Sequence, residues 1–468
     1  MYCFITTRFV GLRCVEICGC AKLRGYQPGQ FIDIKDYSYS HTWNAVRIDG
    51  YWHFVDCNWG VSHIPGSVNF DPFRFEYDEH YFLADPDVII QTHCPNDQSW
   101  QLLVQPFNIE QFNAAVPLKP DFFKFGFELL NQPKAFIEAP NGDLDIRLKC
   151  PAGFILYCKL STVEGGREVS LHGTHFSQYV FIHQMAEDTM ACYVRIPEPG
   201  QYYATFHAKQ QFIDNELNLE SQTEICRYLV RNYAPSGDQE PLPMSPADHW
   251  GPVGLVQAGL TPHTHHGGVI MCQDGADIDI PFKKTKKLKF THDMTAVGLQ
   301  HLKPYSFQRD VNDDMVITLC PPRPGRYGLH LYTVYPGIPR PIHLCSYLIV
   351  MSVVRPMVQP IPAPPTGEEY GPTVAFGNLG FGAFTHSDPF IRTQDSTIQI
   401  ILSLSSKVIL KYNLVYNPPA CNDISSTVKC QRDSNSLTFD LVLNQPGYYH
   451  FRLEGKNVVV YNYLIRKD

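Results

Sequence analysis

Apolar and polar residues alternate on both sides of Asp49-Gly50. Asp-Gly between two strand-like runs predicts an antiparallel hairpin with a two-residue turn. The numbers of facing residues then sum to 99, so Trp43 lies opposite Asp56 and His41 lies diagonal to Asp56 on the same face. Diagonal neighbours are roughly 7–8 Å apart, within reach of long side chains. The pattern places an imidazole and a carboxylate side by side under an indole. It fits a catalytic base with its orienting acid, and it equally fits core packing around one satisfied polar pair.

The residues before this hairpin predict a helix and a strand. Met1–Phe9 is apolar enough for a buried helix that ends at Gly11, and Leu12–Lys22 has the composition of a strand. A turn is expected at Gly25–Gly29. We expect this first unit to close near Phe107.

From about Pro120 onward the pattern indicates strands alone and contains an internal repeat. A strand-like run meets Pro-Gly three times, each with a tyrosine two residues after the glycine: Pro199-Gly200 with Tyr202, Pro324-Gly325 with Tyr327, and Pro446-Gly447 with Tyr449. Each is followed by a closing strand with a similar tail, namely Tyr228–Val230, Tyr347–Ile349 and Tyr463–Ile465. Such a tyrosine is typical of the tyrosine corner in immunoglobulin-like sandwiches, where the phenol bonds to backbone a few residues upstream.

The repeat predicts three β-sandwich modules, at residues 120–233, 250–355 and 370–468, after a first unit at 1–110. Proline-rich joints, 234–252 and 355–372, separate the modules and are expected to act as semi-rigid spacers. The predicted fold class is therefore α+β in the first unit, followed by mainly-β sandwiches.

Composition excludes several classes of protein. Hydrophobic residues make up 44% of the chain and charged residues 18%, which is the composition of a folded protein. The net charge of -8 argues against a general nucleic-acid binder. No run approaches about 18 apolar residues, so we expect no membrane span.

The 15 cysteines are scattered, and Cys18-Gly19-Cys20 is one residue too tight for the usual zinc spacing. We therefore expect no metal and no cofactor.

Arg8 interrupts the apolar start and no basic region precedes it, so the sequence predicts no signal peptide. A cytoplasmic protein with reduced thiols follows as the expectation.

A family resemblance becomes specific at His41–Val46 and Trp52–Gly60. These runs resemble the histidine and aspartate motifs of the transglutaminase-like superfamily, in particular its kyphoscoliosis peptidase and hillarin branch. Four further segments resemble landmarks of that branch: Gly11–Cys14, Gly25–Gln30, Tyr81–Pro86 and Trp100–Leu103. The three β-modules are similar to the immunoglobulin-like modules of the same branch. The resemblance covers nearly the whole chain.

This resemblance implies a papain-like unit with a cysteine nucleophile, a histidine base and an aspartate. His41 and Asp56 match the last two, and Trp43 and Trp59 are expected either to line a groove or to pack the core. The family pattern places the nucleophile a few residues before Met1, so the N-terminal unit is expected to be partial. Cys3 would lie about two helical turns further on, out of reach of His41. Cys14, Cys18 and Cys20 are expected to be buried and inert, and Cys57 to face away from Asp56.

Two functions of different class remain open. The first is a cytoplasmic, cytoskeleton-associated scaffold, a pseudoenzyme whose transglutaminase-like unit is degenerate and whose partners are proteins, as the resemblance implies. The second is an active cysteine peptidase or acyltransferase in a longer form of the chain. A secreted adhesion rod is a third reading, and it would require native disulfides.

Three further features of the sequence can each be interpreted as structural or as functional. His263–His266 is expected to be a solvated loop rather than a metal site, and the basic run Lys283–Lys289 a solvated strand or hairpin tip rather than a docking site. The edge strands of the sandwiches offer places where an extended peptide can add a strand.

Overall fold

The structure is a computed structural model that describes residues 7, 9–23, 25–62, 76–210, 212–213, 216–217, 222–234, 240–247, 249–252, 254–354, 358–364, 369–404, 409–417 and 422–468. The chain divides into two compact units. Unit 1 comprises residues 1–242 and 247–249, and unit 2 comprises residues 243–246 and 250–468, with the division inside β18 (His249–Trp250). Most of the predicted helix at Met1–Phe9 lies outside the described residues.

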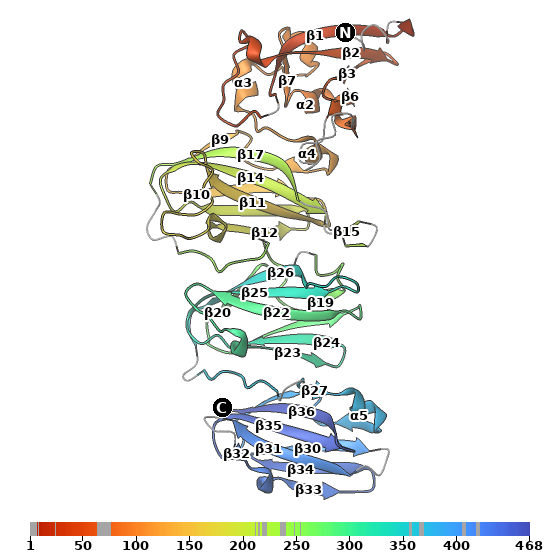
Figure 1. The fold of residues 1–468 in the computed structure, drawn as a ribbon, viewed down its shortest axis with the longest axis vertical. Coiled ribbons are helices and arrows are strands. Elements are labelled where there is room, and N and C mark those ends of the chain that lie inside the picture. The colour runs from red at the N-terminus through yellow and green to blue at the C-terminus, as the bar shows by residue number, and fades with distance from the viewer. Residues whose placement is uncertain are drawn as a thin grey trace. The chain divides into compact units, whose positions relative to one another are not determined.

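Unit 1 begins with an antiparallel sheet whose strand order is β6-β3-β2-β1-β7 (Figure 1). The strands are β1 (Arg13–Ala21), β2 (Ser40–Ile48), β3 (Tyr51–Val55), β6 (Phe82–Ala84) and β7 (His93–Pro95). A small separate ladder joins β4 (Val61–Ser62) to β5 (Glu76–Tyr77). Short helices connect these strands and lead onward: η1 (Tyr37–Tyr39), η2 (Glu79–Tyr81), α2 (Pro86–Ile89), η3 (Gln98–Gln101), α3 (Ile109–Ala114) and α4 (Pro120–Lys124).

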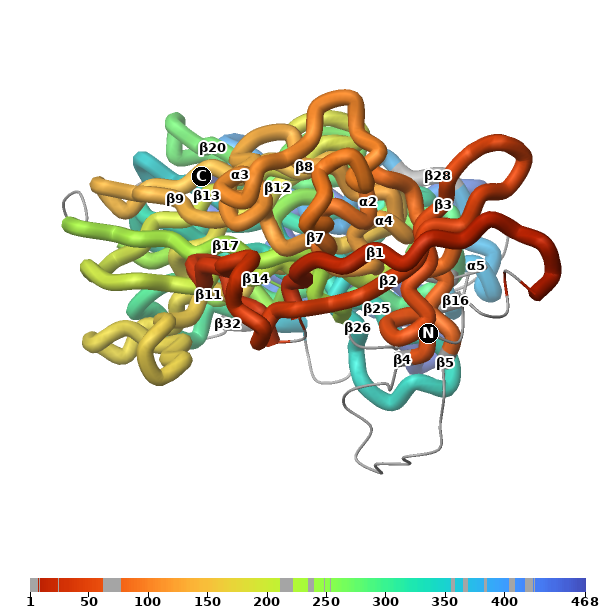
Figure 2. The backbone as a smooth tube through the Cα atoms, turned by 90° about the horizontal axis from the view of Figure 1, so that it is seen from above, coloured from red at the N-terminus to blue at the C-terminus, as the bar shows by residue number. Residues whose placement is uncertain are grey.

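The long central strands β1 and β2 run side by side in the top view (Figure 2). One face of the sheet is apolar because Ile17, Trp43 and Phe54 point into a common core cluster. Among the described residues, the core clusters on the other face lie at its two ends, around Cys14 and around Cys20. Cys18 lies between those ends and is exposed, so the expectation that it is buried is wrong.

A first β-sandwich completes unit 1. One sheet has the order β12-β13-β10-β8 and the other β11-β14-β17-β9. The strands are β8 (Glu128–Leu129), β9 (Phe136–Ala139), β10 (Asp143–Lys149), β11 (Phe154–Thr162), β12 (Val180–Ala186), β13 (Thr189–Arg195), β14 (Gly200–Gln210) and β17 (Thr223–Asn232). The helical turn η4 (Phe176–Tyr179) precedes β12, and β15 (Phe212–Ile213) pairs with β16 (Glu216–Leu217).

Unit 2 contains two further sandwiches. The first pairs β19-β21-β24-β23 with β20-β26-β25-β22. Its elements are β19 (Leu260–Pro262), β20 (Val269–Cys272), β21 (Ile278–Lys284), β22 (Lys289–Ala296), η5 (Lys303–Tyr305), β23 (Ser306–Val311), β24 (Asp314–Leu319), β25 (Gly325–Val334) and β26 (Ile342–Met351). The basic run Lys283–Lys289 spans the mostly exposed connection from β21 to β22, which belong to different sheets.

The second sandwich of unit 2 has the order β27-β36-β35-β31-β32, with β29 also on β36, and a second sheet β28-β30-β34-β33. Its elements are β27 (Gly371–Pro372), α5 (Val374–Asn378), β28 (Phe381–Phe384), β29 (Phe390–Thr393), β30 (Thr397–Leu404), β31 (Leu410–Asn417), β32 (Asn422–Asp423), η6 (Ser425–Thr427), β33 (Lys429–Arg432), β34 (Ser436–Val442), β35 (Gly447–Gly455) and β36 (Val458–Lys467). The core of this sandwich is one cluster of buried aromatic and aliphatic side chains from both sheets.

The same strand pairing recurs in all three sandwiches. An early strand pairs in parallel with the final one: β9 with β17, β20 with β26, and β29 with β36. Adjacent pairs in the rest of each sheet are antiparallel, which is the arrangement of immunoglobulin-like sandwiches. The three final strands contain the repeated Tyr-Leu-Val/Ile tails that the sequence indicated.

The three tyrosines after Pro-Gly form tyrosine corners, which confirms the prediction from the repeat. Each phenol donates a hydrogen bond to the backbone carbonyl four residues upstream: Tyr202 to Glu198 (3.0 Å), Tyr327 to Arg323 (2.7 Å) and Tyr449 to Gln445 (2.7 Å). The preceding glycines have φ angles of 150°, 150° and 135°, a region that disfavours side chains, so glycine is needed at this position of the turn. Among the described residues, no helix is long and apolar enough to cross a membrane.

Candidate functional site

The candidate site is built on the β2–β3 hairpin, whose register confirms the prediction. Ile48 faces Tyr51 and Asn44 faces Val55. Asp49 and Gly50 both have positive φ angles, 51° and 90°, as a type I′ turn requires. Asp56 is the next residue after β3, so the hairpin brings its carboxylate to His41 near the start of β2.

Asp56 accepts four hydrogen bonds in an almost fully buried position. Its Oδ2 atom accepts from Nε2 of His41 (2.6 Å) and from Nε2 of His93 (3.1 Å). Its Oδ1 atom accepts from the backbone amides of Asn58 (2.9 Å) and Trp59 (3.1 Å). Burial disfavours the charged carboxylate, but the hydrogen bonds from the two histidines outweigh this and hold the pKa of Asp56 well below its usual range.

These contacts fix the tautomers of both histidines. A carboxylate ion only accepts hydrogen bonds, so Nε2 of His41 and Nε2 of His93 each carry a proton. A neutral His41 then has its lone pair on Nδ1, on the side of the ring away from Asp56. This is the arrangement of a general base held by an acid: one nitrogen is anchored and the other is available to take a proton.

His93 is the functional residue that the sequence did not reveal. It begins the three-residue strand β7, where it faces Ala21 of β1, and it is almost fully buried. Its Nδ1 atom lies 2.8 Å from the hydroxyl of Thr92. Burial lowers the pKa of His93, which favours the neutral ring. The sequence does show a histidine soon after the apolar run around Ile89. However, β7 has only three residues, which is too few for the alternation of apolar and polar positions that identifies a strand.

Aromatic rings surround the pair of histidines. The ring of Trp43 stacks on that of His41 with centroids 6.1 Å apart, and the ring of Trp59 lies 5.2 Å from His41 and 4.6 Å from His93. Trp43 is buried and Trp59 is half-buried, both against the same core cluster. The structure therefore shows both tryptophans packing the site, while the expectation that they line a substrate groove stays a prediction.

Gly19 allows this packing. It lies on β1 between His41 of β2 and Pro95 of β7. A Cβ atom on Gly19 would lie 2.8 Å from the ring of Trp43 and 2.2 Å from the carbonyl oxygen of Cys94. No side chain fits there, so only glycine lets the indole and β7 approach β1 closely.

His41, Asp56 and His93 are also the residues here that could hold a metal. One donor atom from each lies within 4.8 Å of the others, and two histidines with one carboxylate suit zinc or iron. A cation would have to displace the two Nε2 protons whose hydrogen bonds Asp56 now accepts. The three side chains are thus already hydrogen-bonded to one another and need no metal to satisfy them.

The described cysteines do not supply a nucleophile to this network. None of their thiols is hydrogen-bonded to His41 within the part of the chain that the structure describes, and Cys57 is exposed beside Asp56. Cys3 lies outside the described residues. At the other candidate metal site, His263 pairs with Asp314 at 3.0 Å, and no group of three possible ligands gathers around it among the described residues.

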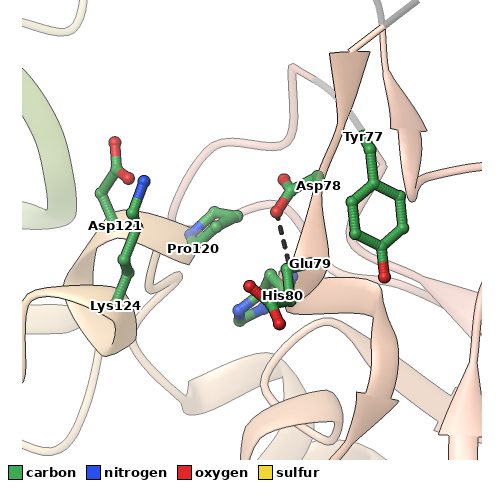
Figure 3. A pocket seen from close by; sticks show the side chains of 7 residues that line it. All are labelled: Tyr77, Asp78, Glu79, His80, Pro120, Asp121 and Lys124. Carbon is green, nitrogen blue, oxygen red and sulfur yellow. Dashed lines mark hydrogen bonds between the residues drawn. The ribbon is translucent and has the colours of Figure 1, made fainter.

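A hollow in unit 1 lies away from this network (Figure 3). It has a volume of about 620 Å³ and is lined by Tyr77, Asp78, Glu79, His80, Pro120, Asp121 and Lys124. The Asp78 carboxylate accepts a hydrogen bond from the His80 amide (3.1 Å), the dashed line in Figure 3, which caps a helical turn. None of the residues that line this hollow belongs to the network of His41, Asp56 and His93.

Comparison with known proteins agrees with the fold. The family model for the KY-like, immunoglobulin-like domain matches residues 109–243, 256–362 and 372–464. An I-band fragment of titin aligns with 73% of this chain and 97% of its own at 10% identity, with a TM-score of 0.13, which is too low to support any argument.

Curated relatives match over most of this chain. It is 27% identical to hillarin of Drosophila melanogaster, over 71% of this chain and 42% of hillarin. It is 27% identical to Lim and transglutaminase domain protein ltd-1 of Caenorhabditis elegans (73% and 50%) and 28% identical to kyphoscoliosis peptidase of Mus musculus (57% and 37%). The chain thus spans half the length of these relatives or less. The three matches to the family model together cover well over half of the chain, and we conclude that it belongs to the family of proteins with KY-like, immunoglobulin-like domains.

Proposed function

We propose that this protein is a cytoskeleton-associated scaffold whose three immunoglobulin-like sandwiches bind protein partners. The observation that carries this proposal is the succession of three sandwiches of the same design, each matched by the KY-like family model. Repeated modules on short joints hold several binding surfaces on one chain, which raises the effective concentration of each partner for the others.

Exposed sheet edges support partner binding. All four residues of the edge strand β33 are exposed, and β33 pairs with β34 on one side only. An unpaired strand edge presents free backbone donors and acceptors to an extended peptide. In this proposal the N-terminal unit is a degenerate transglutaminase-like unit that retains His41 and Asp56 as the remnant of a catalytic centre.

A second candidate function is thiol-dependent acyl transfer or peptide cleavage in a form that supplies a cysteine to His41. The observation that favours it is the complete hydrogen-bond set of Asp56, which holds His41 with Nδ1 as the basic nitrogen. The names of two relatives, a transglutaminase domain protein and a peptidase, fit this chemistry.

The reaction would follow the usual order for a thiol nucleophile. His41 would take the thiol proton at Nδ1, and the thiolate would attack the carbon of a glutamine side-chain amide or a peptide carbonyl. His41 would then return the proton to the leaving amine, which leaves a thioester for an amine or water to resolve. Asp56 would hold the ring and stabilise the imidazolium.

One experiment separates the two candidates. A longer form of the chain, which the second candidate requires, is treated briefly with iodoacetamide and every cysteine is followed by peptide mass spectrometry, in wild type, His41→Ala and His53→Ala. His53 is the control because it lies on the same hairpin outside the network. One fast-reacting cysteine that slows only in His41→Ala would favour the enzyme. Uniformly slow labelling in all three proteins would favour the scaffold.

The scaffold proposal also has a direct test. Co-sedimentation with filamentous actin and with microtubules measures binding to two cytoskeletal polymers. We expect the chain to pellet with one of them, equally well with or without His41→Ala. If the chain pellets with neither polymer and one cysteine is labelled fast in a His41-dependent way, the scaffold proposal is contradicted and the enzyme candidate remains.

A further inference from the structure

A second cluster of reactive groups lies on the opposite face of the sheet from the histidines. Strands β1 and β7 place Cys20 directly opposite Cys94. Both side chains are buried, with Tyr26, Ile32 and Phe112 around them. Each thiol shifts the pKa of the other. The ladder therefore places the two side chains side by side on one face of the sheet.

A buried lysine stands next to this thiol pair. Lys22 directly follows β1, two residues after Cys20, and its amide continues the ladder by donating to Thr92, so both side chains point to the same face. Its Nζ atom donates to the carbonyl oxygen of Ala115 (3.1 Å) and lies 4.6 Å from the ring centroid of Phe112. Burial lowers the pKa of Lys22 to about 7, so the side chain exchanges its proton near neutral pH.

The two cysteines have unequal roles in this setting. The interaction with Cys20 lowers the pKa of the Cys94 thiol against the opposing effect of burial, and the nearby Lys22 ammonium lowers it further. The interaction with Cys94, together with burial, raises the pKa of Cys20. Cys94 is thus the member that becomes a thiolate, and thiolates are the reactive form towards oxidants.

The backbone geometry permits a disulfide at this position. The amide of Lys22 donates to Thr92 (2.9 Å) and the amide of Asn96 donates to Cys18 (3.0 Å), so Cys20 and Cys94 occupy a hydrogen-bonded pair of the ladder. Such pairs have Cα atoms about 5.5 Å apart, inside the range of about 4.4–6.8 Å found for disulfides. β7 is the edge strand of its sheet, where a small oxidant can gain access when the edge opens.

We propose that Cys20 and Cys94 are a reversible oxidation site that reacts with small hydroperoxides. The Cys94 thiolate attacks the peroxide oxygen, the O–O bond breaks, and Cys94 becomes a sulfenic acid as the first water leaves. The sulfur of Cys20 then attacks the sulfenic sulfur, which releases the second water and forms the disulfide. Two thiols supply the two electrons that reduce one hydrogen peroxide to two waters.

The disulfide would act on the neighbouring histidine. His93 precedes Cys94 on β7 and points to the other face, where it donates to Asp56. A covalent link between β1 and β7 changes the path of this three-residue strand and so the position of His93. Oxidation would thereby weaken the hydrogen bond between His93 and Asp56, whichever of the proposed functions holds.

The experiment treats the full chain with hydrogen peroxide, blocks the remaining thiols and maps the cysteines by non-reducing peptide mass spectrometry. We expect a cross-linked peptide pair joining Cys20 to Cys94 that disappears with dithiothreitol. The internal control is the pair of buried thiols Cys158 and Cys192. Burial and the interaction with Cys158 raise the pKa of Cys192, and no lysine is among the groups that shift it. This control pair should stay reduced.

Two variants test the roles of the residues. In Cys20→Ser the sulfenic acid at Cys94 should persist and react with dimedone. In Lys22→Met the rate of cross-linking should fall roughly tenfold, because the positive charge that favours the Cys94 thiolate is lost. The proposal is overturned if Cys20 and Cys94 stay reduced in the wild-type chain while the exposed Cys18 and Cys57 are oxidised.

Discussion

Nε2 of His93 lies 3.1 Å from the same Asp56 oxygen that accepts the hydrogen bond of His41. Two imidazoles, one from the central strand β2 and one from the edge strand β7, therefore share one carboxylate oxygen. Because both lone pairs of Oδ2 are used, the carboxylate cannot rotate without losing a donor. His93 acts as a positioning residue for His41.

Replacing His93 tests this role. In His93→Leu one acceptor site of a buried carboxylate loses its donor, which we expect to lower the free energy of unfolding by about 1–3 kcal/mol. The nitrogen-15 shifts of His41 should change from one tautomer to a mixture. His93→Gln keeps an amide donor near the Nε2 position and should restore the single tautomer. A His41 spectrum that is the same in all three proteins would contradict the role of His93.

Gly19→Ala tests the close approach of Trp43 and β7 to β1. The added methyl group meets backbone as well as the indole, so neither neighbour moves without cost, and we expect a loss of about 2–3 kcal/mol or failure to fold. Gly25→Ala is the control, because Gly25 has a φ of 93° and open space around it. It should cost only about 1 kcal/mol from backbone strain. Urea denaturation compares the two, and equal losses would refute the steric argument.

Each tyrosine corner should stabilise its own sandwich. Tyr202→Phe, Tyr327→Phe and Tyr449→Phe each remove one phenol hydrogen bond to a backbone carbonyl, with an expected loss of about 1 kcal/mol each. Tyr37→Phe serves as the control, since Tyr37 is 92% exposed and should have no effect. The measurement is thermal or urea unfolding. If the corner variants match wild type, the corners mark the turn without stabilising it.

His330 predicts how the stability of unit 2 depends on pH. Its ring is buried between Thr295 and Ser346, and burial lowers the pKa of His330 to about 4. Between pH 6.5 and 4 the unfolded chain binds a proton that the folded chain does not. The free energy of unfolding should therefore fall as the pH decreases through this window, by up to about 3 kcal/mol. His330→Gln should flatten the dependence, and an unchanged slope would exclude this residue as the cause.

The sequence predicted those features that depend on short, local patterns. Asp49-Gly50 sets the register that joins His41 to Asp56, and Pro-Gly with a following tyrosine marks each corner. It did not reveal His93 or the partner of Cys20, because β7 has three residues and joins β1 by contacts more than seventy positions apart. The prediction that Cys18 is buried was wrong for a related reason. Strand alternation indicates the face of the sheet on which a residue lies, but it does not indicate which part of that face other elements cover.

The parallel pairing of an early strand with the final strand has a mechanical consequence for each sandwich. Tension along the chain pulls the two partners, such as β20 and β26, in opposite directions along their common axis. Their hydrogen bonds are then loaded together in shear instead of opening one at a time. Each of these pairs should therefore resist a pull on its two strands more strongly than a pair whose hydrogen bonds open in turn.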